Sequence, residues 1–248
     1  ISRDGHRLYP AFPYTSFAGL SDGDLMDLYA HLMSQPAVSQ PNQAAQMRGL
    51  AAWRATLAAW NGLFHVNQPF EDDPRLNEAQ NRGAYWVQTV GHCGACHTPR
   101  NFWGAERQDQ HLRGAMVEGW HAPALDALNR SAVPWTEEAF YRYLRQGHSP
   151  WHAAAGGPMA LIVREMQGVP DQVLRDMAAY LAALNPSVAQ LTTADVQSLS
   201  EQAVQQAAAR APAPDAAQRQ FQGSCGACHH DGDGPRLLGV NTPLALNS

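Results

Sequence analysis

The four cysteines of this 248-residue chain all lie in two near-copies of one pattern. The first copy is Cys93-Gly94-Ala95-Cys96-His97 and the second is Cys225-Gly226-Ala227-Cys228-His229. Residues three and four apart share one face of a helical turn, so the two thiols and the imidazole of each copy converge. Such a set suits thioether bonds to the two vinyl groups of a porphyrin, with the imidazole bound to iron. The pattern indicates c-type haem attachment.

Other uses of paired cysteines fit less well. A structural zinc site needs four ligands brought together, and its cysteine pairs usually lie about 15–20 residues apart. Here the pairs begin at Cys93 and Cys225, which is much farther apart, so a structural zinc site is disfavoured. A thioredoxin-like dithiol expects a βαβ context, and strand signals are poor throughout the chain. A disulfide within each pair would form only in an oxidising compartment and would not require the following histidine.

The rest of the chain is predicted to be almost entirely helical. Ser21 and Thr136 are the expected N-caps of two helices, and Gly147 is expected to end the second of them. Each cysteine motif follows a helix, and the distance between the motifs favours separate haem domains in series. The predicted fold class is mostly α, with tandem haem domains joined by linkers. The expected helices span 22–33, 46–63, 77–90, 137–146, 170–184, 194–210 and 216–222.

An iron bound by His97 has a sixth position on its other face. A thioether there would raise the reduction potential, and a second imidazole would lower it. Met159 lies in the predicted loop Gly156-Gly157-Pro158-Met159, where a side chain can be aimed at iron, so it is the favoured ligand. Core packing explains two other methionines better, Met166 and Met177. The histidine alternatives are His148 and His152.

The second motif is incomplete in this sequence. Only 19 residues follow His229, and none is a methionine. His230 adjoins His229 and cannot reach the opposite face of the same haem. We expect Cys225 and Cys228 to attach haem and His229 to bind its iron, and we expect the natural chain to continue past Ser248.

Composition narrows the class of partner. The formal net charge is −5, and haem propionates would make it more negative. This balance disfavours nucleic acid, because phosphate binding requires a basic patch. No apolar stretch approaches the roughly 18–20 residues that cross a bilayer. The chain begins at Ile1 rather than Met, which removal of an upstream segment explains most simply.

Several stretches carry a family resemblance. They are Arg3-Asp4-Gly5, Leu8-Tyr9-Pro10-Ala11, Asn81-Arg82-Gly83-Ala84-Tyr85, Gly91 through Arg100, Gly119-Trp120-His121-Ala122-Pro123, Gly157-Pro158-Met159 and Ala179-Tyr180-Leu181. Together they resemble the three-haem cytochrome c subunits of bacterial membrane-bound dehydrogenases of the alcohol, aldehyde or gluconate type, and of related molybdenum hydroxylases. The likeness covers nearly the whole chain. The stretch Leu237-Leu238-Gly239-Val240-Asn241-Thr242-Pro243 is similar to cytochromes that accompany molybdenum hydroxylases acting on aldehydes or N-heteroaromatics such as nicotinate.

The resemblance implies a series of cytochrome c-like domains. They would be the end of a first domain (1–36), a helical connector (37–76), a complete domain (77–185), a linker (186–214) and the start of a further, truncated domain (215–248). A further haem motif is expected upstream of residue 1. The family places its ligand methionine at Met159. In many relatives the first domain has a methionine where Phe12 stands, so its haem would be ligated differently or lack a protein sixth ligand.

The resemblance also implies a function. The protein would carry heme c and pass electrons from the catalytic subunit of a dehydrogenase to quinone or a terminal oxidase, without being an enzyme itself. The catalytic subunit would be a quinoprotein, a flavoprotein or a molybdenum enzyme, and the location would be the periplasm, at the outer face of the cytoplasmic membrane. Two alternatives remain. A di-haem cytochrome c peroxidase also has two separated motifs, and a haem-based sensor would bind gas at an open iron.

Overall fold

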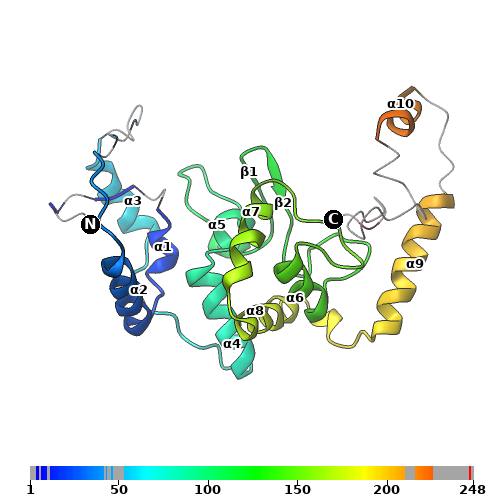
Figure 1. Cartoon of the computed structure of the whole chain (residues 1–248), viewed down its shortest axis with the longest axis horizontal. Coiled ribbons are helices and arrows are strands. Elements are labelled where there is room, and N and C mark those ends of the chain that lie inside the picture. The colour runs from blue at the N-terminus through cyan, green and yellow to red at the C-terminus, as the bar shows by residue number, and fades with distance from the viewer. Residues whose placement is uncertain are drawn as a thin grey trace.

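The computed structural model describes residues 4–5, 7–9, 12–41, 43, 46, 53–209, 216–225 and 246. This part is mostly helical, as the sequence predicts. It also contains a two-stranded antiparallel sheet, which the sequence does not predict. In Figure 1, α1–α3 lie at one end of the long axis, α4–α8 with the sheet in the middle, and α9 at the other end. The elements are α1 (Tyr14–Phe17), α2 (Asp22–Ser34), α3 (Thr56–Phe64), α4 (Glu78–Tyr85), the π-helical turn η2 (Trp86–Val90), α5 (Gly94–His97), η3 (Gln108–Gln110), β1 (Ala115–Val117), β2 (Trp120–Ala122), α6 (Glu137–Gln146), α7 (Gly157–Glu165), η4 (Met166–Gly168), α8 (Asp171–Ala183), η5 (Pro186–Val188), α9 (Thr193–Ala209) and α10 (Ala216–Ser224).

The helix that leads into the first cysteine motif, α4, crosses α8 with the two backbones in contact. A Cβ at Gly83 would overlap the carbonyl oxygen of Asp176, so the crossing requires glycine. Beside it, Arg82 donates from Nε to Asp176 Oδ2 at 2.7 Å, and only 4% of the Asp176 side chain is exposed. A second bond from the same guanidinium, at 3.1 Å, makes the pair bidentate and fixes the register of the two helices.

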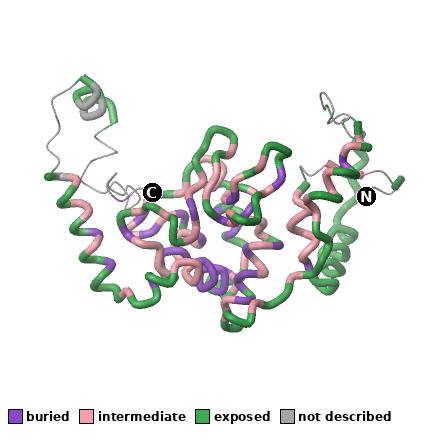
Figure 2. The backbone as a smooth tube through the Cα atoms, turned by 180° about the vertical axis from the view of Figure 1, so that it is seen from behind, coloured by how far each residue is buried: buried purple, intermediate pink, exposed green. Residues whose placement is uncertain are grey.

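The larger apolar core of the described residues lies between α4, η2, α6 and α8. Figure 2 shows buried residues concentrated in this central part of the molecule. Met166 and Met177 are both core residues, as the sequence predicts. The core comprises Ala84, Val87, Leu112, Phe140, Leu144, Met166, Leu174, Met177, Ala178, Tyr180 and Leu181.

Two predicted elements are wrong in detail. The helix expected over 46–63 begins only at Thr56 within the described residues. The hydroxyl of Thr56 donates to the carbonyl oxygen of Trp53 at 2.8 Å, a local bond that competes with helix extension. The predicted loop Gly156–Met159 is instead the start of α7, where Pro158 fits because the first turn needs no N–H from it.

The helix α9, within the predicted linker 186–214, has a buried side. Although its sequence is mostly polar, Val196 and Ser200 are buried. Val196 forms a second, smaller apolar cluster with Val133 and Leu246. This helix therefore packs against the central part. Among the described helices, none is both long enough and apolar enough to span a bilayer.

Candidate haem site

The first cysteine motif forms a single short helical turn directly after η2. The amide of His97 donates to the carbonyl oxygen of Cys93 at 2.9 Å, which closes the turn. Cys93 is half-buried, Cys96 is exposed, and both are free thiols in the described structure. Burial raises the pKa of the Cys93 thiol to about 12. The three predicted attachment residues are therefore brought together, as free thiols and an imidazole on one turn.

A main-chain carbonyl orients the imidazole of His97. Its Nδ1 lies 2.7 Å from the carbonyl oxygen of Pro123. Because a carbonyl only accepts, Nδ1 carries the proton and Nε2 keeps its lone pair, which is the form that binds metals. Burial lowers the pKa of His97, which keeps the ring neutral. No described residue is bonded to Nε2, so the ring fits the role of an axial iron ligand with its second nitrogen held.

Gly114 lets the Pro123 segment approach His97. Its amide donates to the His97 carbonyl oxygen at 2.7 Å, and its φ of +82° favours glycine. A Cβ at Gly114 would lie 2.8 Å from the amide nitrogen of Ala124. The buried Thr98 adds a bond in which its Oγ1 accepts from the amide of Leu112 at 3.0 Å. The last residues of the loop before β1 are thus tied to His97 and Thr98.

The β1–β2 hairpin supplies the Pro123 segment. Val117 pairs with Trp120, and the two residues between them, Glu118 and Gly119, both have positive φ, as in a type I′ turn. The chain leaves β2 at Ala122 and reaches Pro123 at once. The hairpin therefore fixes where the carbonyl that holds His97 is presented.

Met159 lies in the first turn of α7 rather than in a loop. It is partly buried and packs against the main apolar core. The start of α7 contacts the hairpin, since a Cβ at Gly157 would lie 2.6 Å from the ring of Trp120. The segment 120–123 therefore contacts both His97 and the helix that carries Met159.

One histidine alternative has a packing role in the structure. His152 is buried, with Nδ1 2.6 Å from Ser149 Oγ and Nε2 3.0 Å from the carbonyl oxygen of Val133. Its ring stacks on Trp135 with centroids 3.7 Å apart. Both ring nitrogens are engaged, so neither is available to iron in this arrangement. His148 has Nδ1 3.2 Å from the Gln146 carbonyl oxygen, which leaves its Nε2 as the remaining imidazole candidate.

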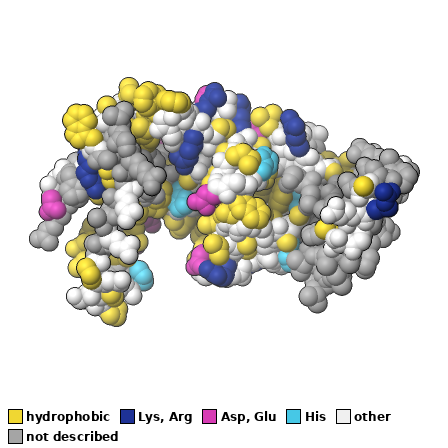
Figure 3. Space-filling model, turned by 90° about the horizontal axis from the view of Figure 1, so that it is seen from above, with side chains coloured by type: hydrophobic (Ala, Val, Ile, Leu, Met, Phe, Trp, Pro, Cys, Tyr) yellow, Lys and Arg dark blue, Asp and Glu magenta, His cyan; other side chains and the backbone are white. Residues whose placement is uncertain are grey.

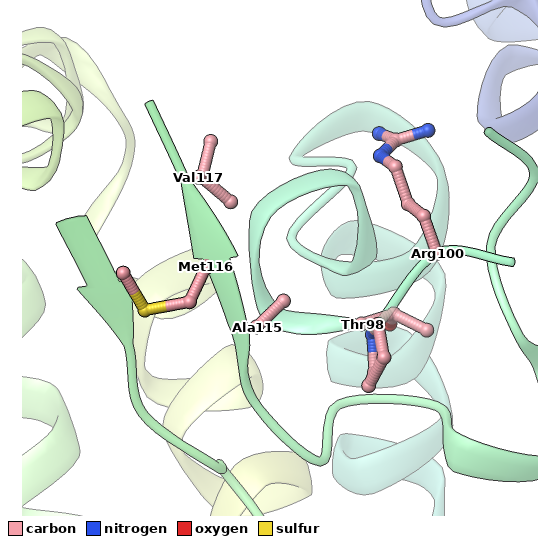
Figure 4. A pocket seen from close by; sticks show the side chains of 6 residues that line it. Thr98, Arg100, Ala115, Met116 and Val117 are labelled. Atoms are coloured by element: carbon pink, nitrogen blue, oxygen red, sulfur yellow. The ribbon is translucent and has the colours of Figure 1, made fainter. Parts of the chain in front are cut away.

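A pocket of about 310 Å³ lies beside the motif, between the chain after His97 and β1. Figure 4 shows Arg100 on one side of it and Met116 on the other. The segments that flank the motif also expose large apolar side chains, among them Phe102, Trp103, Met116 and Trp120. Seen from above, the central part carries hydrophobic side chains interspersed with charged ones (Figure 3).

The other predicted site residues are only partly described. Cys225 is an exposed free thiol that directly follows α10. Cys228 and His229 lie outside the described residues. Phe12 is exposed and packs edge-on against Phe17, with ring centroids 5.3 Å apart.

Sequence reasoning from residue types missed Gly114 and Pro123 as parts of the site, whereas it expected Trp120 to pack around haem or the core. Neither Gly114 nor Pro123 has a side chain that binds metal, and their hydrogen bonds with His97 arise only from the folded loop. The signal that could have found Pro123 is the stretch 119–123, which carries the family resemblance.

A mostly helical fold that holds two free thiols and an oriented neutral imidazole on one turn defines the class of c-type cytochromes. No protein-family model matches the chain. Among curated proteins, a nicotinate dehydrogenase subunit of Pseudomonas putida is 43% identical over 100% of this chain and 20% of its own length. The fructose dehydrogenase cytochrome subunit of Gluconobacter japonicus is 36% identical, over 74% of this chain and 38% of its own length.

The gluconate 2-dehydrogenase cytochrome c subunit of Pantoea cypripedii is 33% identical, over 96% of this chain and 55% of its own length. The relatives of the chain are thus cytochrome c subunits of dehydrogenases, which are haem-containing electron-transport proteins. It spans between 20% and 55% of the length of these three relatives.

Proposed function

We propose that this chain is a multihaem c-type cytochrome that passes electrons from the catalytic subunit of a dehydrogenase to quinone or a terminal oxidase. The observation that carries the proposal is the hydrogen bond from His97 Nδ1 to the Pro123 carbonyl oxygen, at 2.7 Å, beside two free thiols. Ligation of haem iron accounts both for a neutral imidazole held in this way and for the two cysteines beside it. The names of the relatives support a role for this chemistry in a dehydrogenase complex.

In this proposal the chain's residues attach and orient the haem. Cys93 and Cys96 form the thioethers, His97 is the proximal ligand and Met159 is the sixth ligand. Bound heme c supplies a one-electron iron couple, while the protein sets its potential through the axial ligands and burial. Cys225, Cys228 and His229 are proposed to hold a second haem in the same way.

The proposed division into domains gains support from a likeness between α2 and α8. Leu25, Asp27, Leu28 and Leu32 of α2 match Leu174, Asp176, Met177 and Leu181 of α8 in type and spacing. In α8 these side chains are buried against α4 and its neighbours, whereas all of α2 is exposed; Leu25 is 43% exposed and Leu174 0%. We therefore propose that α2 is the closing helix of another cytochrome c domain, in agreement with residues 1–36 as the end of such a domain.

The proposed partner is a dehydrogenase catalytic subunit in the periplasm, at the outer face of the cytoplasmic membrane. A molybdenum enzyme that oxidises an N-heteroaromatic acid is favoured over a quinoprotein or a flavoprotein. The support for this choice is the similarity of the whole chain to a nicotinate dehydrogenase subunit. The relatives favour electron transfer over a di-haem peroxidase, because those compared are dehydrogenase subunits.

The first test is a pyridine haemochrome spectrum of the purified, denatured protein, with haem counted per chain. Two covalent haems are expected. A chain that carries zinc and no haem would overturn the proposal. The second test is Met159→Ala, which should remove the spectrum of a thioether-ligated iron and lower the reduction potential. An unchanged spectrum and potential would exclude Met159 as the ligand.

Electron transfer itself can be separated from peroxidase activity. The haem-loaded protein should be reduced by the substrate-loaded dehydrogenase and reoxidised by a quinone or an oxidase. Peroxide-dependent oxidation of a reduced cytochrome, faster than with free haem, would favour the peroxidase instead.

A further inference from the structure

Trp120 of the hairpin packs on the first turn of the helix that carries Met159. A Cβ at Gly157 would lie 2.6 Å from both Cδ2 and Cε2 of the indole and 2.9 Å from Cζ2. Three neighbouring ring carbons at similar distances place a face of the indole over the Gly157 backbone. Gly157 has a φ of +52°, a region that favours glycine, so its conformation and its lack of a side chain both serve this contact.

The start of α7 is held in part by Met159, which packs on the main apolar core, and not by a hydrogen-bonding side chain at its N-cap. Its N-cap is Gly156, and no side chain of the described residues caps the helix by a hydrogen bond. Pro158 has no N–H to donate. Farther along, α7 is anchored by Val163, whose Cγ1 would lie 3.3 Å from a Cβ at Gly147. The contact with Trp120 is therefore an apolar constraint on a first turn that no described side chain caps by a hydrogen bond.

The same short segment also fixes the other proposed ligand. Three residues after Trp120, the carbonyl oxygen of Pro123 accepts from His97 Nδ1 at 2.7 Å. One end of the segment thus contacts the helix of Met159 and the other end orients His97. A shift of this segment would move both groups relative to each other.

We propose that Trp120 is a positioning residue that holds the first turn of α7 so that the sulfur of Met159 reaches iron. Through this contact it sets the strength of the iron–sulfur bond and hence the reduction potential. The proposal rests on the ligation by Met159 proposed above. Trp120 acts by packing alone, because its contacts with Gly156 and Gly157 are apolar and carry no charge.

The test uses the haem-loaded chain with Trp120→Ala, Trp120→Phe and Gly157→Ala. Three properties are measured: the weak red absorption band of thioether-ligated ferric haem, the imidazole concentration that displaces the native ligand, and the reduction potential. Trp103→Ala is the matched control, since Trp103 is 65% exposed and Trp120 is 54% exposed. The unfolding midpoint of each variant is recorded separately, so that a general loss of stability is recognised.

In Trp120→Ala, imidazole should displace the native ligand at an about tenfold lower concentration, which corresponds to about 1.4 kcal/mol. The red band should weaken and the potential should fall. Gly157→Ala should act in the same direction, because its Cβ would meet the indole. Trp120→Phe should lie between Trp120→Ala and the unmodified protein, because a six-membered ring still covers Gly157. Trp103→Ala should leave all three properties unchanged.

The proposal is overturned if Trp120→Ala matches Trp103→Ala in all three properties while Met159→Ala loses the red band. It is also overturned if Trp120→Ala lowers only the unfolding midpoint, since that shows a purely structural role. If Met159→Ala itself leaves the spectrum unchanged, the ligation proposal fails and the role of Trp120 fails with it. The Met159→Ala result thus tells the two failures apart.

Discussion

Gly114 donates its amide hydrogen to the carbonyl oxygen of His97 at 2.7 Å while its α-carbon faces the backbone of residues 122–124. This relationship ties the loop before the hairpin to the cysteine motif and brings the Pro123 carbonyl within reach of the imidazole. The geometry leaves no room for a side chain at position 114. The positions that support the candidate site can therefore be tested with small substitutions.

Gly114→Ala should weaken both the fold and the haem site. The added Cβ would lie 2.8 Å from the Ala124 amide nitrogen, and the φ of +82° is strained for alanine. We expect a loss of about 1–3 kcal/mol in the free energy of unfolding, together with a lower reduction potential. The matched control is Gly104→Ala, with a φ of +78° and open space around its Cα in the described structure. Equal losses in the two variants, measured by denaturant unfolding, would contradict the close approach.

Gly83→Ala should separate α4 from α8. Its Cβ would overlap the backbone carbonyl of Asp176, which cannot move as a flexible side chain can. We expect a loss of more than about 3 kcal/mol in unfolding free energy, or failure to fold. Gly62→Ala in α3 is the control, because Gly62 has open space within the described structure and alanine favours the helix by up to about 1 kcal/mol. Similar midpoints for both variants would contradict the crossing.

Loss of the Arg82–Asp176 pair should make the fold more sensitive to acid. Burial alone would raise the pKa of Asp176, but hydrogen bonds from Arg82 and Gln172 together with the charge of Arg82 bring it below its ordinary value. A lowered carboxyl pKa gives stability that is present above about pH 4 and is lost as the pH falls further. In Arg82→Gln the opposing effect of burial should prevail, so stability should begin to fall at a higher pH.

The measurement is the free energy of unfolding between pH 3 and pH 7. Arg107→Gln is the control, because the paired side chains of Arg107 and Asp109 are 43% and 66% exposed. Parallel curves for Arg82→Gln and Arg107→Gln would show that the buried position of the Asp176 carboxylate has no effect on acid stability.

His152 should contribute a second pH dependence, in a different range. Burial lowers its pKa to about 4, from the value near 6.5 in the unfolded chain. As the pH falls, His152 gains its proton in the unfolded state before it does so in the folded state. The unfolding free energy therefore keeps its full value above about pH 6.5 and falls by up to about 3 kcal/mol between that pH and about pH 4. His152→Gln should be less stable at pH 7 but should lose less stability over this range. The control is His31→Gln, at an exposed position on α2, which should leave the pH dependence of the unfolding free energy unchanged. An unchanged pH dependence in His152→Gln would show that His152 does not cause it.

Local signals were enough to predict much of the fold. Ser21 and Thr136 cap their helices as expected, and Gly147 ends α6 with a φ of +80°. These features depend on neighbours in sequence, so the sequence alone reveals them. The start of α7 was missed because Gly-Gly-Pro is typical of a loop, and the indole that packs on Gly157 belongs to Trp120, far away in the chain.

In the candidate site, too, the features set by neighbours in sequence could be predicted and those set by distant residues could not. The turn that gathers Cys93, Cys96 and His97 follows from their spacing, and the structure has it. The orientation of His97 depends on a backbone carbonyl 26 residues away. Because every residue type has such a carbonyl, the sequence does not reveal which one accepts this hydrogen bond. Cys228 and His229 lie outside the described residues, so their roles stay predictions.

The acceptor that orients His97 belongs to the main chain, and this affects how the protein can evolve. A side-chain acceptor would be lost by a single codon change, whereas every residue type at position 123 still presents a carbonyl. The orientation of the imidazole therefore tolerates substitutions at position 123 itself, provided that the path of the backbone is kept. Selection should act instead on the glycine at position 114, which has no side chain to vary. Natural variation around the motif can then tune the haem environment without losing the bond that holds the ring.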